Sequence, residues 1–76
     1  MNKQRRQAID KVYAKLEELM EDLEAIKGEE EEARDNLPES LQESERGEMM
    51  GEAIDNLEEA INDIQEAIEY LHDAMQ

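Results

Sequence analysis

Glu69 and His72 come nearest to a metal-binding arrangement in type and spacing. Carboxylate-bridged di-iron sites take a Glu-x-x-His step from each of two helices and further glutamates from two others. This chain has one such step, because it contains a single histidine. Relative to the neighbouring apolar residues, Glu69 and His72 fall at heptad positions b and e, outside a helix core, and Glu30 is the one glutamate expected inside. We therefore predict no metal and no cofactor.

The carboxylates do not include an acid–base pair that the sequence can single out. General acid–base catalysis uses one desolvated carboxyl group beside a hydrated one, whereas nearly all Asp and Glu residues here fall at exposed helix positions. The chain has no cysteine, no Ser-His-Asp order, no phosphate-binding glycine loop and no calcium-loop pattern. We predict that this protein is not an enzyme.

Two series of apolar residues, spaced alternately by three and four, indicate two amphipathic helices. The first series begins with Ile9 at heptad position a and weakens near Glu30, and the second is the more regular. The predicted helix–helix core consists of Ile9, Val12, Leu16, Leu19, Leu23 and Ile26 from the first helix, with Ile54, Leu57, Ile61, Ile64, Ile68 and Leu71 from the second.

Further residues widen both apolar stripes. Tyr13 and Met20 lie at position e of the first helix, and an alanine recurs every seven residues at position g of the second. Small side chains let a neighbouring helix approach closely, and a chain of this size without disulfides is seldom stable alone. We predict a homodimer or higher oligomer, with a four-helix bundle as the expected form. The predicted oligomer contacts are Tyr13, Met20, Ala53, Ala60, Ala67 and Ala74.

The segment between the two series contains the residues that favour a chain reversal. Pro38 disfavours the helical conformation of the residue before it and predicts the end of the first helix. Ser40, with Glu43 at capping-box spacing, and Ser44 are alternative N-caps for the second helix. Gly47 and Gly51 suggest either a close backbone contact or a weak first turn.

These signals predict one all-α domain over residues 1–76, an antiparallel two-helix coiled-coil hairpin. We expect a first helix over about 3–36, a loop over about 37–44 and a second helix over about 45–75. The numbers of facing residues are expected to sum to about 80, so that each a position of one helix meets a d position of the other.

Charge restricts the partners that this protein can bind. The chain has 8 Lys and Arg against 23 Asp and Glu, a net charge of -15, which repels nucleic acid phosphates and anionic membranes. We therefore predict no direct contact with nucleic acid or membrane, and a protein partner with a basic surface. No apolar run is long enough to cross a bilayer and the first residues do not resemble a signal peptide, so we expect a cytoplasmic protein.

The negative charge concentrates at the end of the molecule that carries the loop. Residues 1–15 hold a net charge of +4, and all the others together hold -19. Since loops often carry function, we predict that the partner binds here. The candidate partner-binding residues are Glu29, Glu30, Glu31, Glu32, Glu43, Ser44, Glu45, Arg46, Glu48 and Met49.

A resemblance to known proteins covers nearly the whole chain and is most distinctive at Asn36-Leu-Pro-Glu-Ser-Leu-Gln and Ser44-Glu-Arg-Gly47. These segments resemble small acidic helical-hairpin proteins encoded by phages and prophages of low-GC Gram-positive bacteria. That group offers no catalytic residues to carry over. The resemblance implies a location in the host cytoplasm and, by analogy with other small acidic phage proteins, action on a host protein.

Three hypotheses for function follow. The first is a non-enzymatic hairpin that binds a protein through its acidic tip, such as a phage-encoded inhibitor of a host nucleic-acid-binding or defence protein. The second is an assembly module that acts through its apolar seam. The third is a binder of a small anionic ligand, held by Arg34 or Arg46 in a groove of an oligomer.

Overall fold

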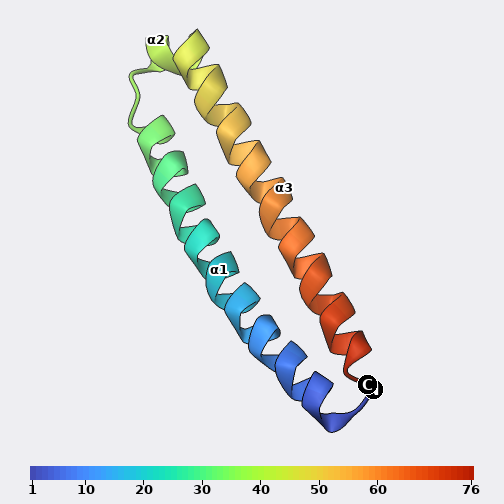
Figure 1. Ribbon diagram of the computed structural model, residues 1–76. Helices are drawn as coiled ribbons and strands as arrows, with labels where there is room; N and C mark the ends of the chain where they lie inside the picture. Colours follow the sequence, from blue (N-terminus) through green and yellow to red (C-terminus); the bar gives the residue numbers. More distant parts are fainter.

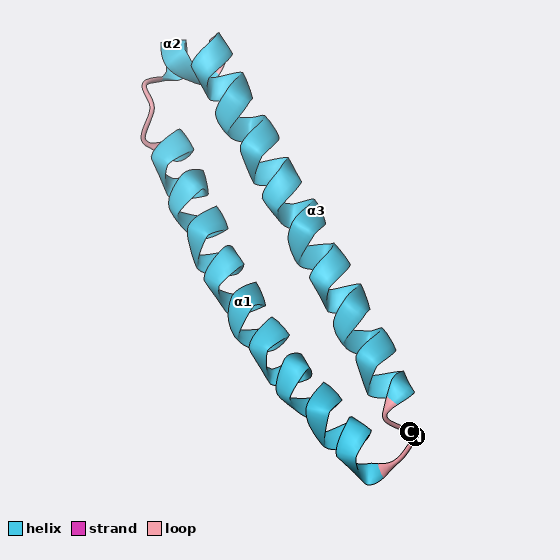
Figure 2. Cartoon of the chain, in the orientation of Figure 1, coloured by secondary structure: helices cyan, strands magenta, loops and turns pink.

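A computed structural model describes residues 1–76, and all its regular structure is helical. The elements are α1 (Lys3–Asp35), α2 (Glu39–Gln42) and α3 (Glu45–Ala74). The molecule measures 58 × 14 × 12 Å, and Figure 2 shows helices joined by short loops. The prediction of an all-α fold is confirmed.

The two long helices lie side by side and run in opposite directions, so that both chain termini lie at one end (Figure 1). We call the other end, which carries α2, the tip. Polar side-chain contacts join the helices in the half near the tip: Lys27 on α1 pairs with Glu58 on α3, and Arg34 donates to the backbone of Gly47.

Both ends of α1 have a local explanation in the sequence. Asn2 precedes the helix, and its side-chain oxygen accepts a hydrogen bond of 2.8 Å from the backbone N–H of Arg5. An N-cap of this kind satisfies one of the free N–H groups of the first turn. At the other end Asn36 donates to the Glu32 carbonyl at 3.0 Å, and the last residue of the helix, Asp35, lies three residues before Pro38.

The connection differs from the predicted loop over 37–44 because it contains a helical turn. Pro38 initiates α2, and its carbonyl accepts hydrogen bonds from the backbones of Leu41 and Gln42. The Gln42 amide then donates to the Leu37 carbonyl at 3.0 Å. Ser44 precedes α3, but its hydroxyl donates to the carbonyl of Leu41 and makes no cap with α3. The capping box expected at Ser40 is absent, since Ser40 lies inside α2.

The core between the helices is small. The buried residues are Gly47, Ile61 and Ile68, all on α3, and no side chain is completely enclosed. The remaining apolar residues of the α3 series, Ile54, Leu57, Ile64 and Leu71, are half-buried. On α1 the half-buried apolar residues are Ile9, Tyr13, Leu16, Met20 and Leu23.

The predicted core of α1 needs a correction. Val12, Leu19 and Ile26, which were expected against α3, are 48%, 53% and 50% exposed. The apolar stripe of α1 occupies positions a, d and e, which is wider than one neighbouring helix can cover. In the structure α3 covers positions a and e, where the residues of α1 also make their polar contacts through Lys27 and Arg34. Position d is left at the surface.

The pairing register also differs from the predicted one. The half-buried residues of α1 and α3 match when facing numbers sum to about 84, as do the contacts of Lys27 with Glu58 and of Arg34 with Gly51. The reversal is therefore centred near Gln42, two residues beyond the centre at residue 40 that the expected sum of 80 implies.

Candidate interaction surfaces

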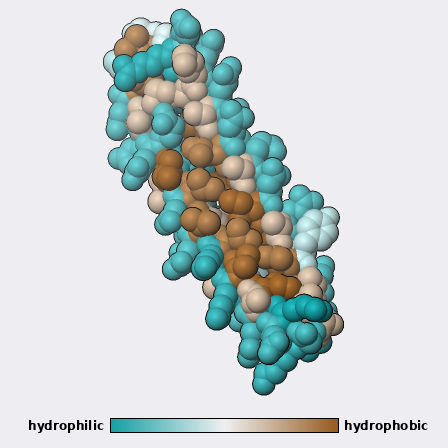
Figure 3. Space-filling view, viewed as in Figure 1, coloured by the Kyte–Doolittle hydropathy of each residue, from teal (hydrophilic) through white to brown (hydrophobic).

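An exposed line of large aliphatic residues follows one side of α1. It consists of Val12, Leu19 and Ile26, spaced by seven residues, and we call it the apolar stripe. Figure 3 shows a hydrophobic band along the molecule between hydrophilic margins. Single exposed apolar residues are common on protein surfaces, but three aligned on one face of an acidic chain form a patch. Contiguous exposed apolar patches mark interaction sites.

Residues of α3 continue this face. In an antiparallel pair, position d of one helix and positions d and g of the other lie on the same side, and the e positions lie on the opposite side. The alanines at g therefore lie on the face of the apolar stripe. Ala60 and Ala67 are half-buried beside the helix contact, while Ala53 and Ala74 are exposed.

Two of the predicted oligomer contacts belong elsewhere. Tyr13 lines a shallow hollow with Gln65, Ile68 and His72 of α3, so it packs within the helix pair. Met20 is also half-buried. Both residues lie at position e, which α3 covers, and this corrects their assignment to an outer surface. In the first two heptads positions d and e of α1 are both apolar, so these residues alone did not show which position α3 covers.

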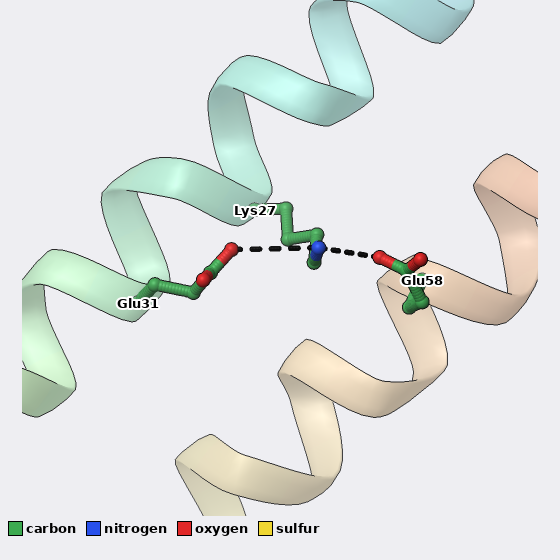
Figure 4. Close-up of polar contacts among 3 residues, drawn as sticks. All are labelled: Lys27, Glu31 and Glu58. Carbon is green, nitrogen blue, oxygen red and sulfur yellow. Dashed lines mark ion pairs between the residues drawn. The ribbon is translucent and has the colours of Figure 1, made fainter.

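The opposite face is polar and carries an ion-pair cluster. Lys27 on α1 pairs with Glu58 on α3 and lies 3.5 Å from Glu31 one turn along its own helix (Figure 4). The hydrogen bond that Lys27 donates to the Glu58 carboxylate, together with the negative charges of Glu31 and Glu58, raises the pKa of Lys27 above its usual value. Glu31 is thus engaged within the molecule, although it was predicted to bind a partner.

Near the tip, α1 is tied to the first turns of α3. Arg34 is half-buried, and its Nε donates to the Gly47 carbonyl at 3.1 Å. Gly47 packs so tightly on the connection that a Cβ there would lie 2.7 Å from the Leu41 carbonyl oxygen and closer still to Gln42. A Cβ on Gly51 would make only an ordinary contact with Arg34. Of the two glycines, Gly47 is the one required by a close backbone approach.

A depression of about 420 Å³ lies between α1 and α3 at the tip end of the apolar face. Met49, Met50 and Ala53 supply its apolar lining, and Met49 is 63% exposed. Glu30, Glu45 and Arg46 supply its charged groups. An apolar hollow with a net negative rim suits a side chain that has a long alkyl stem and a cationic end. We call it the tip depression.

The structure brings together four of the ten predicted partner-binding residues in this depression: Glu30, Glu45, Arg46 and Met49. Met50 and Ala53 were not predicted as part of it, although their positions d and g already placed them beside Arg46. Ser44 bonds to the connection. The carboxylates of Glu29, Glu32, Glu43 and Glu48 are exposed and make no ion pair.

The charge differs strongly between the two halves of the rod. The tip half, residues 20–59, has 3 Lys and Arg against 16 Asp and Glu, a net charge of -13. The half with the termini has 5 Lys and Arg against 7 Asp and Glu, a net charge of -2. The basic residues of the latter all lie between Lys3 and Lys15.

No arrangement of acidic or histidine side chains suits a metal ion: no group of three or more is close enough to hold one. His72 lies 3.8 Å from Asp73 and 3.4 Å from the Gln76 amide, on the exposed surface. None of the helices combines the length and the apolar character needed to cross a membrane.

Comparisons of the chain with protein-family models, curated proteins and solved structures found no match.

Proposed function

We propose that this protein is a non-enzymatic assembly module, a helical hairpin that pairs with a second copy of itself through the apolar stripe to form a four-helix bundle. The observation that carries the proposal is the half-exposure of Val12, Leu19 and Ile26 on one face of a thin rod. Four-helix bundles are built from such faces, with d-type residues meeting in the interior.

The small core gives a second reason for pairing. Two buried isoleucines are too few to offset the ordering of 76 residues. Burying the exposed half of each stripe residue stabilises by roughly 1 kcal/mol, and a dimer buries six of them. The face of the rod, 58 Å by 14 Å, offers on the order of 800 Å² per copy, the size of a standard stable interface.

The neighbouring residues favour close contact on this face. The alanines of α3 present methyl groups beside the stripe, so a facing helix can approach without displacing long side chains. The charged cluster around Lys27 lies on the other face and is not buried by the association.

The test is a charge placed on the stripe. Leu19→Glu should raise the dissociation constant of the dimer by about a hundredfold or more, because two carboxylates would be buried near each other without partners. Gln7→Glu adds the same charge at heptad position f, on the outer side of α1, and should leave association within about threefold of the unmodified chain. Sedimentation velocity measures both. Equal association of the two variants would refute the proposal.

A second candidate function is favoured by the unpaired carboxylates outside the tip depression. Glu29, Glu32, Glu43 and Glu48 make no ion pair, because the nearby cations Lys27 and Arg34 are held within the molecule. Such a surface attracts basic proteins by long-range electrostatics. The partner we propose is a nucleic-acid-binding protein, and the resemblance to phage proteins suggests a host defence factor.

This candidate makes a separate prediction. Replacing Glu29, Glu32 and Glu43 together by Lys should abolish binding to such a partner and leave self-association intact, whereas Leu19→Glu should affect self-association first. Binding by the unmodified chain should weaken steeply between low and high salt. Salt-independent binding, measured by titration calorimetry, would contradict the electrostatic account.

The third hypothesis, an anion site, receives less support from the geometry. Arg34 uses its Nε for the Gly47 carbonyl, and Arg46 shares its depression with Glu30 and Glu45. Two carboxylates beside one guanidinium disfavour an anionic ligand.

A further inference from the structure

The apolar stripe can pair with a second copy in two orientations. Leu19 is its midpoint, with Val12 and Ile26 seven residues away on either side. A parallel dimer would place each stripe residue against its own counterpart. An antiparallel dimer would keep Leu19 against Leu19 and place Val12 against Ile26. Both arrangements bury the same side chains, so the hydrophobic contribution does not select between them.

Charge does select between them. In a parallel dimer two tip halves, each with a net charge of -13, lie side by side. In an antiparallel dimer each tip half lies beside a half with a net charge of -2, whose basic residues lie at the terminal end. Like charges brought together are destabilising, and complementary charges fix the register of helical assemblies.

The tip depression adds a specific contact to this arrangement. Arg5 lies at position d, one heptad before Val12, so it continues the line of the apolar stripe towards the terminal end. When Leu19 of the two copies coincide, Arg5 of one copy falls level with residue 33 of the other. That level lies beside Glu30 and, in the observed register, beside Met50 and Ala53 of the depression.

We propose that two copies associate antiparallel and that Arg5 of each enters the tip depression of the other. The alkyl stem of Arg5 packs on Met49 and Met50, and its guanidinium lies between Glu30 and Glu45. This inference rests on the proposed self-association. It makes the dimer a rod with identical acidic ends, each able to present Glu29, Glu32 and Glu43 to a partner.

Arg46 provides an internal check on the contact. Arg46 lies on the same rim, and its positive charge repels the guanidinium of Arg5. Arg46→Ala should therefore strengthen the dimer by a few fold. Two carboxylates outnumber the one arginine, which is why the depression still favours a cation.

The orientation can be tested by disulfide trapping, because the natural chain has no cysteine. Val12→Cys and Ile26→Cys variants, one of them isotopically labelled, are mixed in equal amounts and oxidised. The antiparallel dimer predicts that the mixed disulfide dominates, well above the half of the product that random pairing gives. Predominant Val12–Val12 and Ile26–Ile26 disulfides would overturn the inference.

Leu19→Cys is the matched control, since residue 19 faces its counterpart in both orientations. If Leu19→Cys does not cross-link and light scattering shows a monomer, the self-association itself has failed. If it cross-links while the mixed disulfide does not form, only the orientation is wrong. Circular dichroism of each variant shows whether the helices are retained.

A second measurement avoids substitutions in the stripe. Spin labels on Gln4→Cys lie about 45 Å apart along the axis in an antiparallel dimer, since each is 15 residues from the centre at 1.5 Å per residue. In a parallel dimer only the width of two helices, about 24 Å, separates them. Electron–electron resonance distances near the shorter value would overturn the antiparallel arrangement.

A charge exchange tests Arg5 itself. Arg5→Glu should weaken the dimer by at least about tenfold, as expected for reversal of a paired charge, and adding Glu30→Arg and Glu45→Arg should restore most of the affinity. Lys11→Glu makes the same charge change at position c, away from the stripe, and should have a much smaller effect. Equal weakening by Arg5→Glu and Lys11→Glu, without recovery by exchange, would refute the contact.

Discussion

The long helices α1 and α3 carry similar heptad patterns but use them differently. On α3 the series converges on α1, and Ile61 and Ile68 become the buried residues of the fold. On α1 the apolar residues divide, because positions a and e pack on α3 while position d forms the exposed apolar stripe. A stripe that is wider than one neighbour can cover leaves a surface for another. The helices therefore differ in that α1 keeps an exposed apolar face, which the proposed dimer would cover.

Matched truncations on the two helices should give the largest difference. Ile68→Ala removes a side chain that is 5% exposed and should destabilise the fold by about 3 kcal/mol, through lost burial and a cavity. Ile26→Ala removes the same atoms at a site that is 50% exposed within one chain. Its effect should be smaller at low protein concentration and grow as dimer forms. Thermal unfolding at several concentrations measures both, and equal, concentration-independent losses would contradict the division of roles.

Glycine substitutions distinguish the tip of α3 from the middle of α1. Gly47→Ala should cost about 1–3 kcal/mol, since its Cβ would clash with the carbonyls of Leu41 and Gln42 and displace the connection. Gly28→Ala should stabilise by up to about 1 kcal/mol, because nothing lies within 4 Å and alanine favours helix. Urea denaturation gives both values. A stabilising Gly47→Ala would mean that the connection does not pack as described.

The ion pair between the helices should make the smallest contribution. Lys27→Met should lower the melting temperature slightly relative to Lys15→Met, whose lysine has no ion-pair partner. Because the folded state raises the pKa of Lys27, its contribution is fully present below the ordinary value of 10.5 and is lost as pH rises through the folded-state pKa. The difference between the two variants should therefore vanish in strong alkali. If the difference in melting temperature persists in strong alkali, the effect of Lys27→Met comes from packing and not from the ion pair.

Much of this architecture could be predicted from residue spacing. The helical class follows from the alternating steps of three and four, and the end of α1 follows from Asn36 and Pro38. The face of α1 that meets α3 could not be predicted, because Val12 and Tyr13, like Leu19 and Met20, are both apolar neighbours. The covered position e also carries Lys27 and Arg34, which make polar contacts with α3.

The tip was less predictable than the helices. Of the two N-cap candidates, Ser40 lies inside α2. Ser44 occupies the N-cap position of α3, but its hydroxyl donates to the Leu41 carbonyl. The acidic character of the tip was evident from composition, and the expected sum of 80 already set Glu30 against Met50. What was not predicted is that Glu45, Arg46 and Met49 join them around one depression. Local residue preferences thus predict where the helices lie, whereas the surfaces between helices depend on how α1 and α3 pair.

The central claim is that the apolar stripe is covered by a second copy of this chain. Sedimentation equilibrium of the unmodified protein, across a wide concentration range at moderate salt, tests it most directly. The account predicts a helical species of twice 8.8 kDa that dissociates to monomers on dilution. A fully helical monomer of 8.8 kDa at high concentration would contradict it.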